Sequence, residues 1–182
     1  MANVKILAPF IIKWEGGFSD KSADKGGATM NGVTYDTFCA FRKEKGLPVP
    51  TIDDLKKISE PEWTEILKKK YWDYWQADNI NSQAIANILV DWAFNSGAVT
   101  SIKSFQSLAG LKVDGVVGPI TLGYINGHKD QTDLFNRIWT ARKDFFTNIV
   151  KNNSTQLIFI NGWLNRLYDM VKYNFKLTPL FP

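Results

Sequence analysis

The sequence predicts a mainly helical protein. Apolar residues recur at spacings of three and four through most of the chain, helix-capping residues precede many of these stretches, and strand-like alternation never extends beyond a few residues. The 182 residues, 45% hydrophobic and 22% charged, are typical of a globular chain that can bury a core. Aromatic residues reach 14%, which favours either a large core or a cleft that stacks on sugar rings.

The first predicted helix ends at Glu15. Its apolar face is formed by Ile6, Leu7, Phe10, Ile11 and Trp14. Pro9 either kinks this helix or marks its first turn, and Gly16 or Gly17 provides the left-handed residue that ends it. A carboxyl at this end meets the negative pole of the helix dipole, and Trp14 shields Glu15 from water. Both effects favour the protonated acid, the form that a glycosidase needs as its proton donor.

Residues 18–34 predict a long loop with room for a short hairpin, because they are rich in Gly, Asp, Ser and Asn. The loop carries Asp20 and Asp24 back past the acid, so either residue could supply a second carboxylate. Asp24 also fits a purely structural role, as a turn residue ahead of two glycines. Thr29 and Thr34 suit either polar contacts in a site or local capping of the backbone.

Helices follow one another through the rest of the chain. Thr51 caps one helix ahead of two acidic residues, and Ser59 or Glu60 starts the next with Pro61 in its first turn. This helix is expected to run on into the aromatic residues 71–75, whose spacing favours core packing over a platform for sugars. Further helices are predicted at 35–45, 82–96, 102–108, after Pro119, at 130–152 and at 154–173.

The helix at 82–96 is apolar on several sides and is expected to be buried centrally. Asp91 and Asn95 lie four residues apart on one of its faces, where an unpaired polar group would cost about 1–3 kcal/mol. Both therefore need partners. One interpretation has them tie this helix to the Gly-rich loop at 18–34, and another has Asn95 line a cleft. The turn at 114–121 is explained by its glycines and proline alone.

Several classes of function are excluded by composition. The net charge of +4 comes from 22 basic and 18 acidic residues without a basic stripe, which argues against a nucleic-acid partner. Cys39 is the only cysteine and His128 the only histidine, so an internal disulfide or a metal site of several such ligands cannot form. We expect no metal and no cofactor. The apolar stretch 84–94 is too short to span a bilayer, so we expect no stable membrane insertion, and we expect a monomer.

A series of motifs along the whole chain resembles the bacterial and phage N-acetylmuramidases of glycoside hydrolase family 108. The motifs are Glu15-Gly16-Gly17-Phe18, Asp24-Lys25-Gly26-Gly27-Ala28-Thr29, Asn31-Gly32-Val33-Thr34, Tyr71-Trp72-Asp73, Phe94-Asn95-Ser96-Gly97, Asp114-Gly115, Gly118-Pro119, and Phe159, Gly162-Trp163 and Arg166. The resemblance implies that Glu15 is the catalytic acid and that the second half is a helical peptidoglycan-binding module. Phe18 departs from the tyrosine usual in the family, which removes a hydroxyl beside the acid.

Glu15, Asp24 and Thr29 are also similar in spacing to the Glu, Asp and Thr of phage lysozymes, with the last gap one residue shorter. This resemblance implies that Glu15 protonates the glycosidic oxygen and that Asp24 activates water or stabilises the oxocarbenium ion. Thr29 or Thr34 would position the water, and Asp20 competes with Asp24 for the second role. The resemblance favours inversion, whereas the sequence itself gives no carboxyl separation that would decide between inversion and retention.

We therefore expect an all-α, lysozyme-like fold, with a catalytic domain at residues 1–86 and a helical peptidoglycan-binding domain at residues 87–182 packed against it. Asp20, Thr34 and Asn95 are expected to contact the substrate. The expected reaction is hydrolysis of the β-1,4 bond between N-acetylmuramic acid and N-acetylglucosamine in peptidoglycan glycan strands.

Chitin, which has the same backbone, is a second possible substrate. The alternative from another class is a catalytically inactive wall-binding or secretion-assisting protein of the same fold. The first five residues lack the pattern of a signal peptide. We therefore expect synthesis in the cytoplasm and action on the cell wall or in the periplasm.

Overall fold

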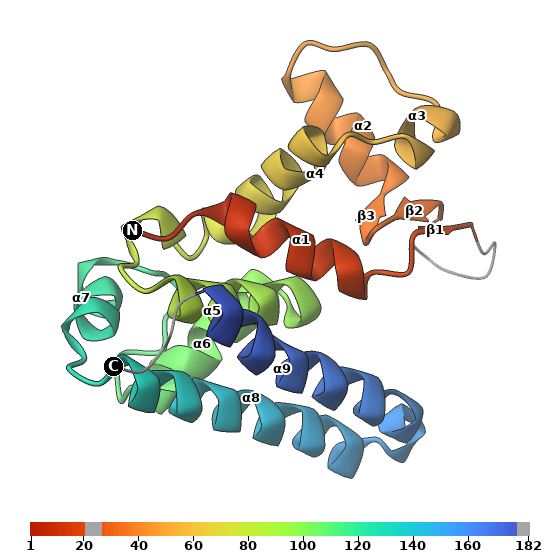
Figure 1. Ribbon diagram of the computed structural model, residues 1–182. Helices are drawn as coiled ribbons and strands as arrows, with labels where there is room; N and C mark the ends of the chain where they lie inside the picture. Colours follow the sequence, from red (N-terminus) through yellow and green to blue (C-terminus); the bar gives the residue numbers. More distant parts are fainter. Residues whose placement is uncertain (21–26, 178–182) are drawn as a thin grey trace. The chain divides into compact units, whose positions relative to one another are not determined.

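A computed structural model describes residues 1–20 and 27–177 of the protein (Figure 1). The chain divides into two compact units. The first unit is Val4–Lys69, and the second unit is Met1–Asn3 together with Lys70–Pro182. Within the described residues there are nine α-helices and one small three-stranded sheet, so the predicted mainly helical fold is confirmed.

The first unit combines four helices with the sheet. Its elements are α1 (Val4–Trp14), β1 (Phe18–Ser19), β2 (Thr29–Met30), β3 (Val33–Thr34), α2 (Tyr35–Glu44), α3 (Ile52–Lys56) and α4 (Glu60–Leu67). The strands are antiparallel in the order β1-β2-β3, so the short hairpin expected in the loop is part of a three-stranded sheet. Helix α1 packs against α4, and α3 contacts both α2 and β2.

Burial explains why α1 forms despite a proline. Leu7, Ala8 and Ile11 on its apolar face are completely buried. Pro9 lies inside the helix, which begins at Val4, so the alternative that Pro9 marks the first turn is wrong. The apolar face therefore outweighs the backbone hydrogen bond that proline cannot make.

Side-chain caps fix the starts of α3 and α4. The Thr51 hydroxyl accepts the Asp54 N–H at 3.2 Å, and the Asp54 carboxylate accepts the Thr51 N–H at 2.7 Å, which is a reciprocal capping box. The Ser59 hydroxyl accepts the Glu62 N–H at 3.4 Å, with a proline in the first turn of α4. Both predicted caps are confirmed.

All the secondary-structure elements of the second unit are helices, within its described residues. After η1 (Lys68–Trp72), which crosses the boundary between the units, come η2 (Ala77–Asn79), α5 (Gln83–Ser96), α6 (Ala98–Leu108), α7 (Pro119–Gly127), α8 (Gln131–Asn152), η3 (Ser154–Gln156) and α9 (Leu157–Leu177). The domain boundary expected between residues 86 and 87 falls inside α5. None of the described helices combines the length and the apolarity needed to cross a membrane.

The aromatic cluster at residues 71–75 contributes to the core of the second unit. Trp72 and Trp75 are completely buried, and the Trp75 indole N–H donates to the Ser101 hydroxyl at 3.1 Å. The helix that precedes them is shorter than expected, because α4 ends at Leu67 and the chain continues as the π-helical turn η1.

Helix α5 is the central helix of the second unit, as predicted. Every residue from Ala84 to Ala93 is buried, and α5 packs against α6, α8 and α9 (Figure 1). The turn before α7 is held from within this unit: the Gln106 side chain donates to Asp114 Oδ1 at 2.9 Å and accepts the Gly115 N–H at 2.8 Å. These bonds give the turn at 114–121 a structural explanation.

A buried ionic cluster joins α5 to the two long helices. Asp91 of α5 is completely buried; its Oδ2 lies 2.6 Å from Arg142 Nη2 of α8, and its Oδ1 lies 2.7 Å from Arg166 Nη2 of α9. We call these three residues the Asp91 cluster. The expectation that Asp91 and Asn95 tie α5 to the Gly-rich loop is therefore wrong for Asp91, whose partners lie 51 and 75 residues further along the chain.

The arginines determine the charge state of Asp91. Burial opposes ionisation, but the positive charges of Arg166 and Arg142 and the hydrogen bonds from both outweigh it and lower the pKa of this carboxyl. A buried carboxylate with this arrangement stabilises the fold only while both partners are present.

Replacing Asp91→Asn is expected to lower the free energy of unfolding by about 3–5 kcal/mol, because it leaves two buried guanidinium groups without their counter-ion. Asp144→Asn, at an exposed position on α8, is the matched control and should change it by less than about 0.5 kcal/mol. Urea unfolding at neutral pH measures both values. Equal stability of the two variants would contradict a stabilising role for the Asp91 cluster.

The same cluster predicts a pH dependence. Because the pKa of Asp91 is lower in the folded than in the unfolded state, its contribution is complete above the unfolded value of about 3.9 and is lost as pH falls through the folded value. The stability difference between wild type and Asp91→Asn should therefore shrink below about pH 4.

Candidate active site

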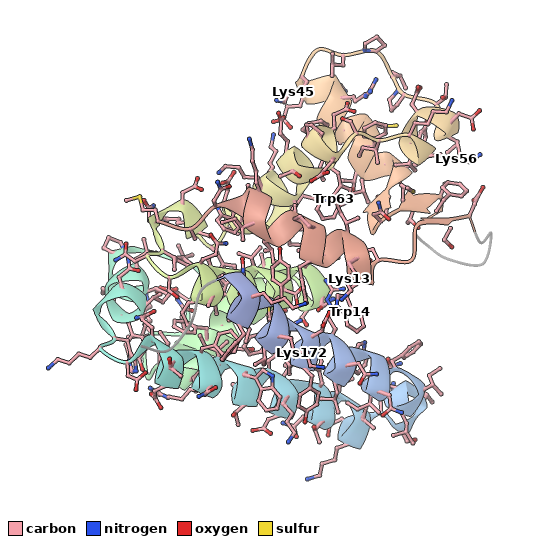
Figure 2. All side chains as sticks on the ribbon, viewed as in Figure 1. Lys13, Trp14, Lys45, Lys56, Trp63 and Lys172 are labelled. Carbon is pink, nitrogen blue, oxygen red and sulfur yellow. The ribbon has the colours of Figure 1, made fainter. Side chains whose placement is uncertain are left out.

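The predicted acid lies where α1 ends. The Glu15 N–H donates to the Ile11 carbonyl at 3.1 Å, which completes the last turn, and both Glu15 and Trp14 are partly buried. Figure 2 labels Trp14 at this end of α1, with the Lys13 ammonium 6.0 Å from the centre of its ring. Glu15 therefore follows Trp14 directly, at the C-terminal and negative pole of α1.

Gly17 turns the chain out of the helix. Its φ of +74° is in the left-handed region, whereas Gly16 has no such conformation. Of the two glycines that the sequence allowed, Gly17 is therefore the one that ends the helix. The Gly17 carbonyl accepts the Asn31 N–H at 3.1 Å. This bond links the end of α1 to the turn between β2 and β3.

The sheet places three hydroxyl-bearing residues side by side. Ser19 pairs with Thr29, and Thr29 pairs with Thr34, so their side chains share one face. The connecting turn has Asn31 at φ +49° and Gly32 at φ +77°, as a two-residue antiparallel hairpin requires.

Helices α4 and α3 hold the sheet from the side. The Trp63 indole N–H donates to the Asn31 carbonyl at 3.0 Å, and the Lys56 ammonium lies 5.0 Å from the centre of the Phe18 ring. Trp63 and Lys56 are labelled in Figure 2. Phe18, which departs from the family motif, therefore contacts a cation with its ring face.

The two candidate threonines differ in what their hydroxyls do. Thr34 is the N-cap of α2, and its hydroxyl accepts the Thr37 N–H at 3.2 Å and contacts the Thr37 hydroxyl at 2.9 Å. Among the residues that the structure describes, the Thr29 hydroxyl makes one long contact, of 3.5 Å to the Ser19 carbonyl. Thr34 thus already has a structural role at the start of α2.

The two candidate aspartates lie in the connection from β1 to β2. Asp20 follows Ser19 directly and is exposed. Asp24 lies outside the described residues. The structure thus brings Glu15, Asp20, Thr29 and Thr34 into the first unit.

Asn95 belongs to the second unit, at the exposed end of α5. Its Oδ1 accepts a hydrogen bond of 2.5 Å from Arg142 Nη2, the same nitrogen that contacts Asp91. Arg142 was not among the residues predicted for the site from the sequence. The sequence does hold a signal for it, because Arg142 lies four residues from Ile138 and four from Phe146, both buried, on α8.

No metal-binding arrangement occurs among the described residues: within 1–20 and 27–177, no three His, Cys, Asp or Glu side chains are grouped to hold an ion.

Comparison with known proteins agrees with these features. Residues 8–97 match the family described as glycosyl hydrolase 108, and residues 100–168 match a predicted peptidoglycan domain. A solved structure, that of Brucella abortus SagA, is similar with a TM-score of 0.73 at 24% identity, over 95% of this chain and 94% of that one. No curated protein matches the sequence.

The fold and the two matches define a peptidoglycan hydrolase, an enzyme of the glycoside hydrolase class. The chain belongs to glycosyl hydrolase family 108, and its second half carries a predicted peptidoglycan domain. Peptidoglycan is therefore its partner, and the expected lysozyme-like fold class is confirmed.

Replacing each of the two glycines after Glu15 in turn tests which of them the turn after α1 depends on. Gly17→Ala is expected to lower the free energy of unfolding by about 1–2 kcal/mol, because an L-residue is strained at a left-handed φ. Gly16→Ala should have a much smaller effect, since an added Cβ there meets nothing within 4 Å and φ is not left-handed. Chemical denaturation of both variants measures the difference, and equal losses would show that the turn does not depend on Gly17.

Proposed function

We propose that the protein is an N-acetylmuramidase that cleaves the β-1,4 bond between N-acetylmuramic acid and N-acetylglucosamine, with Glu15 as the general acid. The observation that carries this proposal is the position of Glu15: it is a partly buried acid that directly follows Trp14 at the end of α1, inside the segment that matches family 108. The reaction needs a carboxyl group that can donate a proton to the glycosidic oxygen.

In this mechanism Glu15 donates its proton to the glycosidic oxygen as the bond to the sugar carbon breaks. A second carboxylate activates the attacking water or stabilises the oxocarbenium ion. We propose Asp24 for that role on the resemblance to phage lysozymes, with the exposed Asp20 as its competitor. Thr29 positions the water, because the Thr34 hydroxyl is already engaged at the start of α2.

The other residues predicted to contact the substrate are assigned by whether their side chains are exposed. We propose that Asp20 and Asn95, both exposed, contact the sugar strand, and that Thr34 acts by fixing the start of α2. Catalysis is assigned to the N-terminal part of the chain, predicted as residues 1–86, and wall binding to the C-terminal part, predicted as residues 87–182. The family matches support this order of functions along the chain.

Glu15→Gln should reduce the clearing of purified cell walls by at least about 100-fold, because a general acid contributes two to four powers of ten. Glu60→Gln, at an exposed position at the start of α4, is the matched control and should clear walls like wild type. Turbidity loss measures the rate. Comparable clearing by Glu15→Gln and wild type would overturn the assignment.

The released fragments identify the bond. Reduction with borohydride followed by sugar analysis should give reduced N-acetylmuramic acid, since a muramidase leaves that sugar at the reducing end. Reduced N-acetylglucosamine instead would identify a glucosaminidase.

A pair of variants assigns the second carboxylate. Asp24→Asn should lower wall clearing by about 100-fold or more, whereas Asp20→Asn should keep most of the activity. Both variants should co-sediment with cell walls to the same extent as wild type, because the change affects turnover rather than wall binding. The reverse ranking would assign the role to Asp20.

A further inference from the structure

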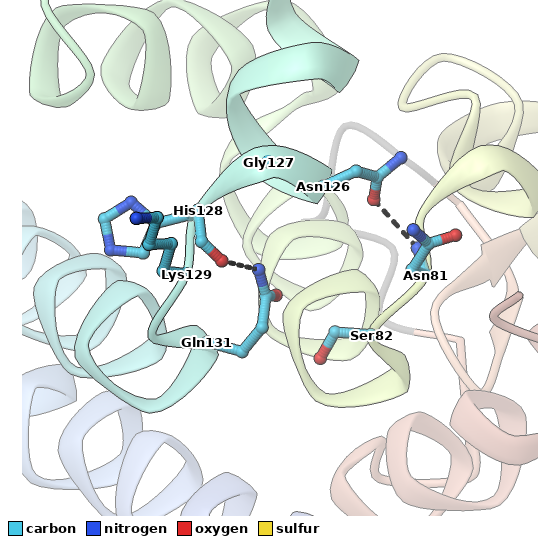
Figure 3. Close-up of a pocket in the computed structure, with 7 residues that line it drawn as sticks. All are labelled: Asn81, Ser82, Asn126, Gly127, His128, Lys129 and Gln131. Carbon is cyan, nitrogen blue, oxygen red and sulfur yellow. Dashed lines mark hydrogen bonds between the residues drawn. The ribbon is translucent and has the colours of Figure 1, made fainter.

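A polar pocket of about 460 Å³ opens in the second unit, between the start of α5 and the connection from α7 to α8 (Figure 3). None of the described residues that line it has an aliphatic side chain. The lining residues are Asn81, Ser82, Asn126, Gly127, His128, Lys129 and Gln131. The last five belong to the segment that matches the predicted peptidoglycan domain. We call this cavity the α7–α8 pocket.

Hydrogen bonds hold the walls of the pocket in place. Asn126 Oδ1 accepts the Asn81 N–H at 2.9 Å, and its Nδ2 donates to the Asn79 carbonyl at 2.8 Å. On the opposite wall, Gln131 Nε2 donates to the carbonyls of Ile125 at 2.9 Å and His128 at 2.8 Å. Figure 3 shows one bond from each wall as a dashed line. The pocket is therefore formed before any ligand arrives.

The groups that remain for a ligand are one cation and several amide-type partners. Within residues 1–20 and 27–177, the ammonium of the exposed Lys129 makes no ion pair, and neither the Asn81 side-chain amide nor Gln131 Oε1 makes a hydrogen bond. The His128 ring is engaged by Asp133, with Nε2 and Oδ2 3.2 Å apart. The pocket thus offers an ammonium, amide donors and one fixed acceptor.

This set of groups matches a carboxylate next to a peptide bond. The ammonium and amide N–H groups suit a carboxylate, and Gln131 Oε1 suits the peptide N–H beside it. A sugar ring offers neutral hydroxyls and an apolar face that prefers large aromatic side chains, and no Trp, Tyr or Phe is among the described residues that line the pocket. The neutral glycan chain is therefore a poor match.

We propose that the α7–α8 pocket binds a peptide segment with a free carboxylate and that its occupant in the cell wall is the stem peptide of peptidoglycan. The inference rests on the proposed function, because it takes peptidoglycan as the substrate. It adds that the second unit recognises the peptide part of the wall in addition to the glycan strand that is cut.

The test uses full-length protein and a matched pair of probes: the free stem tetrapeptide, and the same peptide with its carboxyl groups amidated. Calorimetry should detect binding of the free peptide and at least about tenfold weaker binding of the amidated one, as expected for loss of a charge-assisted hydrogen bond. Backbone NMR signals of Gly127, Lys129 and Gln131 should shift at about tenfold lower concentrations of the free peptide than of the amidated one.

Two exposed lining positions provide the variants, neither of which supports the core. Lys129→Met and Asn81→Ala should each weaken binding of the free peptide, by about tenfold for the lysine. Lys151→Met is the charge-matched control: it lies at the other end of α8, about 30 Å away by helix rise, and should bind like wild type.

Equal binding of the two probes, or unchanged binding by Lys129→Met, would overturn the inference. If the wild-type protein clears cell walls but the tetrapeptide does not shift the NMR signals of the pocket residues, this inference is overturned and the proposed function is not. A wild-type protein that binds the tetrapeptide but releases no reducing sugar from walls would overturn the proposed function instead.

Discussion

The arrangement of the second unit depends on one buried carboxylate. Asp91 lies on the central helix α5 and pairs with Arg142 of α8 and Arg166 of α9, so a single side chain determines how three helices meet. Desolvating these charges is costly and is offset only when all three are in contact, which makes other packings of these helices unfavourable. Arg142 also holds Asn95 at the exposed end of α5. The position of a candidate sugar-binding residue therefore follows from a pairing in the core.

In the first unit the governing constraint is the conformation of the backbone after α1. Gly17 adopts a left-handed φ, and the bond from Asn31 to its carbonyl ties the end of the helix to the hairpin. Glu15 stands between the end of α1 and this turn, which sends the chain into β1. An acid, a sheet face of hydroxyls and an aspartate-bearing connection then come from about twenty consecutive residues. Short-range geometry alone assembles these candidate groups.

Local features were predictable from the sequence, and distant pairings were not. The caps at Thr51 and Ser59 act within four residues, so the pattern of residues reveals them directly. The partners of Asp91 lie 51 and 75 residues away, and the sequence shows only that a buried acid needs some partner. The residues of the α7–α8 pocket likewise come from two separate segments. In the candidate site, Glu15 was recognisable from its glycines, whereas the capping role of Thr34 depended on the observed geometry of α2.

The most direct test of the central claim measures how the activity of Glu15→Gln depends on the leaving group. A dinitrophenyl glycoside of the wall disaccharide expels an acidic phenol that needs no proton, whereas the sugar hydroxyl released from peptidoglycan does. If Glu15 is the general acid, the variant should hydrolyse the dinitrophenyl glycoside at a rate near that of wild type and fail on peptidoglycan. Equal losses of activity on the two substrates would contradict the role of Glu15 as proton donor.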